Sequence, residues 1–126
     1  MGIPFLIGLY VSFRRFVSNR LATRRQYIDL WLDDLRPAPK GWYWATTAEE
    51  AFDILKNHLV FRASFDHDLG QKLTGYDLIK KLVQCREEYK LNFWPTQRPT
   101  IHSANPVGRS NMAQLIDRWG PYNGNG

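Results

Sequence analysis

Three short polar clusters hold the side chains of this sequence that could do chemistry, and each cluster directly follows an apolar run. The clusters span residues 33–34, 66–68 and 102–105, and the groups of interest in them are Asp33, Asp34, Asp66, His67, Asp68, His102, Ser103 and Asn105. Carboxylates that pack together raise one another's pKa or recruit a hard cation such as Mg²⁺. Two histidines can serve as general base and general acid near neutral pH. Together these groups could hold a metal ion and move protons at a phosphate.

Each group has a candidate role in such a site. His67 and His102 are the candidate acid–base pair. Ser103 and Asn105, together with the backbone amides that open the following helix, could bind phosphate oxygens, with Arg109 one turn further on. The candidate ligands of Mg²⁺ or Mn²⁺ are the four carboxylates Asp33, Asp34, Asp66 and Asp68.

The same residues also have purely structural readings. The pair 33–34 could cap or solvate the end of a strand, and His67 could be salt-bridged to a neighbouring aspartate. His102 could be a hydrogen-bonded core histidine, because it belongs to an otherwise buried run. Ser103 and Asn105 could only cap the last helix, since Asn-Pro is a common helix entry. The residues alone leave both readings open.

The elements that position these clusters follow from hydrophobic periodicity. Apolar runs rich in strand formers predict strands at 27–32, 42–45, 60–65 and 100–103. Helical spacing of apolar residues predicts helices from about 47 to 59, from 75 to about 90, and from about 106 to 119. Strands that alternate with helices predict an α/β fold, a three-layer parallel sheet with helices on both faces. In such a sheet the three clusters share the carboxyl edge, where ligands bind.

Charge divides the chain into two parts. The formal net charge is +5, yet residues 27–126 hold twelve basic and twelve acidic side chains, so the excess belongs to residues 1–26. We therefore predict a basic, apolar N-terminal extension (1–26) and one domain (27–126), with no DNA-specific binding. The apolar stretch of the extension is too short to span a bilayer, but it could be a targeting peptide or contact a membrane surface. The lone cysteine, Cys85, excludes an intramolecular disulfide, and we expect a cytoplasmic protein.

The motifs themselves resemble a known family. The strings LWLDDLRPAPKGW, SFDHDLG with TGYDL, and IHSANPVGRSNM resemble the cyclic-phosphate-processing receiver-like domains of the response-regulator receiver superfamily. The resemblance places Asp66 at the phosphoacceptor position, Gly75 at the glycine that opens the next helix, and Ser103 at the Thr/Ser position. It implies a receiver or flavodoxin-like sheet of four strands in the order 2-1-3-4, and a role in RNA repair or biological conflict.

One departure from an ordinary receiver bears on function. The sequence shows no fifth strand and no lysine after Lys90, which counts against phosphoacceptor signalling. The resemblance instead implies a cyclic phosphodiesterase-type hydrolase that acts on a nucleotide or an RNA end, with Asp66 among its catalytic residues. The alternative is a non-catalytic receiver-like module that binds a phosphorylated ligand or a protein partner.

Overall fold

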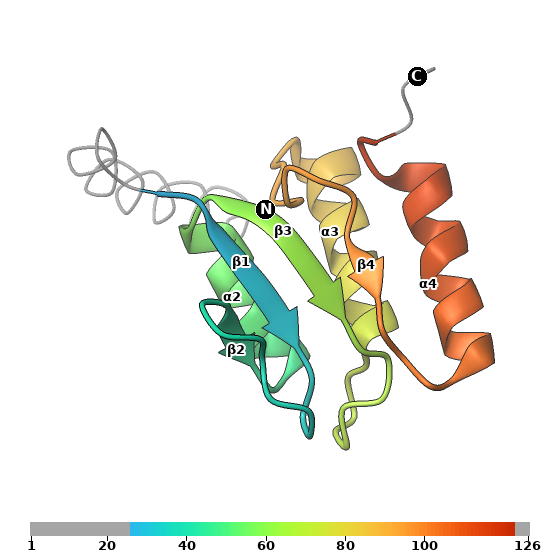
Figure 1. Cartoon of the computed structure of the whole chain (residues 1–126). Coiled ribbons are helices and arrows are strands. Elements are labelled where there is room, and N and C mark those ends of the chain that lie inside the picture. The colour runs from blue at the N-terminus through green and yellow to red at the C-terminus, as the bar shows by residue number, and fades with distance from the viewer. Residues whose placement is uncertain (1–25, 123–126) are drawn as a thin grey trace.

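The computed structural model describes residues 26–122, so the expectations for residues 1–25 lie outside the described part of the chain. In chain order the elements are β1 (Ile28–Leu32), β2 (Tyr43–Ala45), α2 (Ala48–Asn57), β3 (Val60–Phe65), α3 (Gly75–Tyr89), β4 (Thr100–Ile101) and α4 (Pro106–Trp119) (Figure 1). The predicted elements are therefore all present. The fourth strand is shorter than the predicted 100–103, and His102 lies just beyond its end.

The four strands form one parallel sheet in the order β2-β1-β3-β4, which confirms the predicted order 2-1-3-4. The register aligns the strand ends, because Leu32 pairs with both Ala45 and Phe65, and Phe65 pairs with Ile101. The backbone ladder continues one residue further: the Asp66 amide donates to the Leu32 carbonyl oxygen (2.9 Å). The three polar clusters consequently begin in one row at the carboxyl edge of the sheet.

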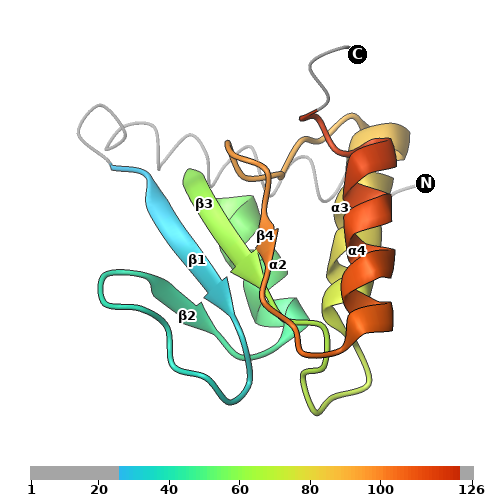
Figure 2. The same ribbon diagram turned by 45° about the vertical axis from the view of Figure 1, so that its right-hand side comes forward.

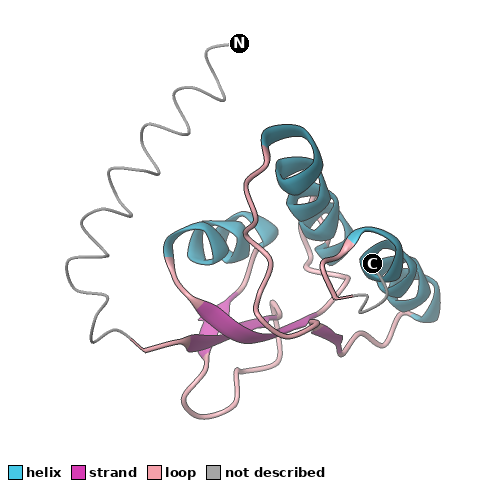
Figure 3. Ribbon diagram, turned by 90° about the horizontal axis from the view of Figure 1, so that it is seen from above, coloured by secondary structure: helices cyan, strands magenta, loops and turns pink. Residues whose placement is uncertain are grey.

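The helices of the described residues all lie on one face of the sheet, which corrects the expectation of helices on both faces (Figure 3). The strand order reverses direction at β1, so right-handed connections from β1 to β2 and from β2 to β3 must pass on opposite faces. The first of these connections, residues 33–42, is a loop rather than a helix. Pro37, Pro39 and Gly41 punctuate it, and Gly41 has a φ of 88°. This loop takes the place of a helix on the second face.

The sheet and the three helices form two layers (Figure 2). The hydrophobic core lies between these layers. Alternate residues of the strands point toward the helices, as the strand period requires. The strands contribute Leu30, Leu32, Ala63 and Phe65, and the helices contribute Ala51, Leu55, Leu78, Ile79, Leu82, Met112 and Ile116. Each large aliphatic side chain buried in this way stabilises the fold by about 1.5–3 kcal/mol.

Polar caps fix where the helices begin. Thr47 caps α2, Thr74 and Asp77 form a capping box on α3, and Asn105 caps α4 by accepting a hydrogen bond from the Gly108 amide. No helix among residues 26–122 is long and apolar enough to cross a membrane.

Candidate functional site

Five of the nine predicted site residues meet in one hollow at the carboxyl edge of the sheet, which we call the acidic pocket. Its volume is about 380 Å³, and it is lined by Asp33, Asp34, Leu35, Arg36, Asp66, Asp68, Gly70, Ser103 and Ala104. All four predicted carboxylates and Ser103 are thus brought together. His67, His102, Asn105 and Arg109 are not among the lining residues.

Three carboxylates in the acidic pocket are close enough to share a cation. Asp33, Asp34 and Asp66 each offer an oxygen, and these oxygens all lie within 4.8 Å of one another. Asp33 is buried, and the other two are half-buried. Three carboxylates at such distances repel one another, and a hard divalent cation with oxygen ligands relieves that repulsion. The donor set therefore fits Mg²⁺ or Mn²⁺.

Asp33 is the most firmly held of these carboxylates. Its Oδ1 accepts hydrogen bonds from the Leu35 and Arg36 amides (2.8 and 2.7 Å), and its Oδ2 is bonded to Nε2 of His102 (2.9 Å). Burial by itself would raise the pKa of the Asp33 carboxyl. The two amides and His102 outweigh this effect and hold the pKa below its ordinary value. Asp33 is consequently an anion with a fixed orientation.

Asp66 is positioned by the close approach of α3 to the end of β3. The Gly75 amide donates to the His67 carbonyl oxygen (2.9 Å), and a Cβ atom at Gly75 would lie 2.0 Å from the Asp66 carbonyl oxygen. Only glycine fits there. Gly70 approaches the Asp34 carboxylate in a similar way, because a Cβ atom on Gly70 would lie 2.9 Å from Oδ2 of Asp34. The two glycines bring the backbone against the acidic pocket.

His102 is fixed on three sides. Its Nε2 faces Asp33, its Nδ1 is bonded to Oγ of Ser64 (2.7 Å), and its ring stacks on Trp31 with centroids 3.9 Å apart. The Thr100 hydroxyl in turn donates to Oγ of Ser64 (2.8 Å). If the Ser64 hydroxyl donates its hydrogen bond to Nδ1 of His102, then the Nε2–H of His102 donates to the Asp33 carboxylate. His102 therefore acts on the pocket through the Asp33 carboxylate.

His67 holds a second carboxylate of the pocket. Its Nδ1 lies 2.8 Å from Oδ1 of Asp68, and its ring packs on α4, where a Cβ atom at Gly108 would lie 2.5 Å from Cγ of the ring. The pKa of the Asp68 carboxyl is lowered, first by the hydrogen bond with His67 and also by the Asn105 amide group. Each of the two predicted histidines is thus bonded to one carboxylate that lines the acidic pocket.

The predicted phosphate holders divide into two groups. Ser103 lines the pocket, and its Oγ accepts a hydrogen bond from the Asn105 amide (3.0 Å). Arg109 donates instead to the Ser103 carbonyl oxygen (2.8 Å), so it braces the turn into α4. Among residues 26–122, Arg36 is the one basic side chain that lines the pocket, and its Nη1 donates to the His102 carbonyl oxygen (3.3 Å).

Several residues that shape the site carried little signal in the sequence. Ser64 and Trp31 hold His102, but in the sequence they look like ordinary members of strands. Gly108 makes room for the His67 ring, although no glycine motif marks it. Arg36 belongs to the proline-containing 33–42 loop, and the structure puts it beside the carboxylates. The only available clue was its position two residues after the Asp33–Asp34 pair.

Comparison with known proteins gives one match. The family described as the cyclic-phosphate processing receiver domain matches residues 28–118, which includes every element of the sheet and the whole acidic pocket. The search of curated proteins and the search of solved structures found no match.

Proposed function

The chain belongs to the cyclic-phosphate processing receiver family, and we propose that it hydrolyses a cyclic phosphate on a nucleotide or an RNA end in the acidic pocket. One observation carries the proposal: Asp33, Asp34 and Asp66 place their oxygens within 4.8 Å of one another, in a pocket that Arg36 and Ser103 also line. Hydrolysis of a phosphodiester needs a positioned water, charge stabilisation on the phosphate oxygens and a proton for the leaving oxygen.

Asp33, Asp34 and Asp66 would hold a divalent cation, Mg²⁺ or Mn²⁺. When bound, the cation supplies positive charge for the phosphate oxygens and lowers the pKa of a water molecule. Asp33 arrives already ionised and oriented by the Leu35 and Arg36 amides. Binding of the cation would then cost little further conformational entropy at Asp33, because this side chain is already oriented.

The side chains of the pocket divide the remaining work. Arg36 and the Ser103 hydroxyl would bind nonbridging oxygens of the phosphate. The carboxylate of Asp68, which is bonded to His67, would accept the proton of the attacking water. The oxygen of that water forms a bond to phosphorus, one ring P–O bond breaks, and the released ribose oxygen takes up the proton that the carboxylate received from the water. The product is a phosphate monoester.

His67 and His102 would serve as the acid–base pair through the carboxylates that they hold. His102 is bonded to Asp33 and His67 to Asp68, so each ring can donate or take up a proton where a pocket carboxylate needs it. A group of this kind is worth about 10² to 10⁴ in rate. We expect His67→Ala and His102→Ala each to lower kcat at least a hundredfold on a cyclic phosphodiester.

Kinetics of matched variants test the proposal. We expect hydrolysis of a 2′,3′-cyclic nucleotide in the presence of Mg²⁺ or Mn²⁺, and a loss of at least a hundredfold in kcat for Asp66→Asn. Asp117→Asn is the control, because Asp117 is an exposed residue of α4 that pairs with Arg98, away from the pocket. Full activity of Asp66→Asn would contradict the proposal.

The alternative is a module that binds a phosphorylated ligand without turnover. One observation favours it: both nitrogens of His102 are already bonded within the protein. In that case a cyclic nucleotide binds to the pocket in the presence of the cation, Asp66→Asn abolishes binding, and no monoester appears.

A further inference from the structure

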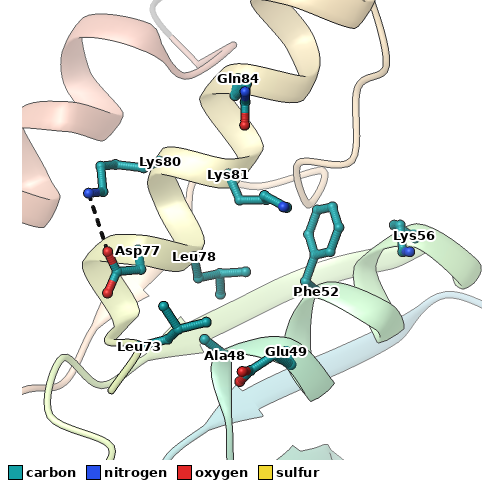
Figure 4. Close-up of a pocket in the computed structure, with 10 residues that line it drawn as sticks. All are labelled: Ala48, Glu49, Phe52, Lys56, Leu73, Asp77, Leu78, Lys80, Lys81 and Gln84. Carbon is teal, nitrogen blue, oxygen red and sulfur yellow. Dashed lines mark ion pairs between the residues drawn. The ribbon is translucent and has the colours of Figure 1, made fainter. Parts of the chain in front are cut away.

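A second hollow lies on the helix side of the molecule, between α2 and α3, and it shares no lining residue with the acidic pocket (Figure 4). We call it the α2–α3 groove. Its volume is about 530 Å³, and it is lined by Ala48, Glu49, Phe52, Lys56, Leu73, Asp77, Leu78, Lys80, Lys81 and Gln84. It combines an aromatic ring with basic side chains.

We propose that the α2–α3 groove binds the nucleotides next to the cyclic phosphate, so that the substrate is single-stranded RNA rather than a free cyclic nucleotide. This inference rests on the proposed function for the identity of the ligand end. Proteins that bind single strands commonly combine a positively charged groove with aromatic side chains on which bases stack.

Phe52 and two lysines provide this combination. Nζ of Lys56 and Nζ of Lys81 lie 5.0 and 5.6 Å from the centroid of the same Phe52 ring, on either side of it (Figure 4). Neither lysine has a carboxylate within ion-pair distance among residues 26–122. Two unpaired ammonium groups around one ring repel each other, and a phosphate bound beside the ring to either of them would offset this repulsion.

The other charges of the groove leave this excess in place. Asp77 pairs with Lys80 (3.3 Å), so these two side chains balance each other. Glu49 lines the end of the groove near the start of α2, away from both unpaired lysines (Figure 4). Burial raises the pKa of the Cys85 thiol, and the charges of Lys81 and Lys56 offset only part of this rise.

The groove and the acidic pocket are close enough for one strand to reach both. Gly70 lines the acidic pocket and Leu73 lines the groove, and these residues belong to the same loop between β3 and α3. A chain segment of three residues spans at most about 11 Å. An RNA whose cyclic 3′ end occupies the acidic pocket could therefore pass over this loop and place its preceding nucleotides beside Phe52.

Binding of a short single-stranded RNA that ends in a 2′,3′-cyclic phosphate tests the inference, with a 2′,3′-cyclic mononucleotide as the second probe. We expect the RNA to bind at least tenfold more tightly than the mononucleotide. The variant Lys56→Gln/Lys81→Gln should weaken RNA binding about tenfold and reduce the slope of log affinity against log salt by about 1.4, since each contact to a single strand contributes about 0.7. The same variant should leave mononucleotide binding unchanged.

The control variant is Lys40→Gln/Lys90→Gln, which removes the same charge away from the groove, from the 33–42 loop and from the end of α3. Unchanged RNA affinity of the groove variant, or an equal effect of the control, would overturn the inference. Equal competition by a poly-glutamate peptide would overturn it as well, because the groove would then bind acidic chains in general. The binding assay does not depend on turnover. RNA binding that requires the two lysines but is not followed by hydrolysis would contradict the proposed hydrolase activity, and the inference that the groove binds RNA would still stand.

Discussion

The substitution Gly75→Ala has two opposing effects on stability, a better helix preference and a close contact of the new Cβ with Asp66. We expect the close contact to dominate. Alanine is about 1 kcal/mol better than glycine inside a helix, and Gly75 opens α3. However, the added Cβ would lie 2.0 Å from the carbonyl oxygen and 3.0 Å from the carbonyl carbon of Asp66, and 2.9 Å from Cε of Met112. The methionine end can move, but the backbone at the end of β3 cannot move without disturbing the sheet.

Overpacking of a core typically costs about 1–3 kcal/mol, and a clash with backbone lies at the upper end of this range. After subtraction of the gain in helix preference, we expect Gly75→Ala to lower the free energy of unfolding by about 2 kcal/mol. For a domain of this size the melting temperature should fall by about 8–16 °C. Differential scanning calorimetry measures it. The shift of Asp66 should also weaken stabilisation by Mg²⁺ or Mn²⁺.

Gly41→Ala is the matched control. Nothing lies within 4 Å of a Cβ atom there, so its cost comes only from the φ of 88°, about 1 kcal/mol. If Gly75→Ala melts at or above the wild-type temperature, or loses less than Gly41→Ala, the reasoning about the α3–β3 contact is wrong.

Three further predictions follow from the site and the core. Mg²⁺ or Mn²⁺ should raise the melting temperature by mass action, and Asp33→Asn should abolish this shift in a thermal melt. The fold lowers the pKa of Asp33 from 3.8, so its contribution to stability is present above about pH 3.8 and is lost as the pH falls through the lower folded value. Chemical denaturation from pH 5 to pH 2 should therefore show a steeper loss of unfolding free energy for the wild type than for Asp33→Asn. Removal of residues 1–26 should leave a single cooperative melt, since the described core is built from residues 28 onward, and a broad transition would contradict this.

The sequence was informative wherever one local signal was enough. Apolar runs that stop at charged residues identified three strand ends, and because the register aligns these ends, the prediction brought Asp33, Asp34, Asp66 and Ser103 to one pocket. Helix positions followed from the periodicity of apolar residues, and the Asn-Pro entry marked the start of the last helix. The second face of the sheet was harder to predict. Alternation favoured helices there, whereas the prolines of the 33–42 loop allow only a loop.

The histidines show where sequence reasoning ends. Their partners come from other elements: His102 meets Ser64 on β3 and Trp31 on β1, and the His67 ring rests on Gly108 of α4. No spacing along the chain reveals which way such a ring turns. The same limit applies to Arg109, whose side chain bonds a backbone carbonyl rather than lining the pocket.

The most direct measurement of the central claim is a phosphorus NMR time course of a 2′,3′-cyclic nucleotide with the protein and Mg²⁺ or Mn²⁺. We expect the cyclic phosphate signal to be replaced by one phosphate monoester signal, and Asp66→Asn to leave the cyclic signal unchanged over the same period. A cyclic signal that persists with the wild-type protein, or that disappears equally fast with Asp66→Asn, would contradict hydrolysis in the acidic pocket.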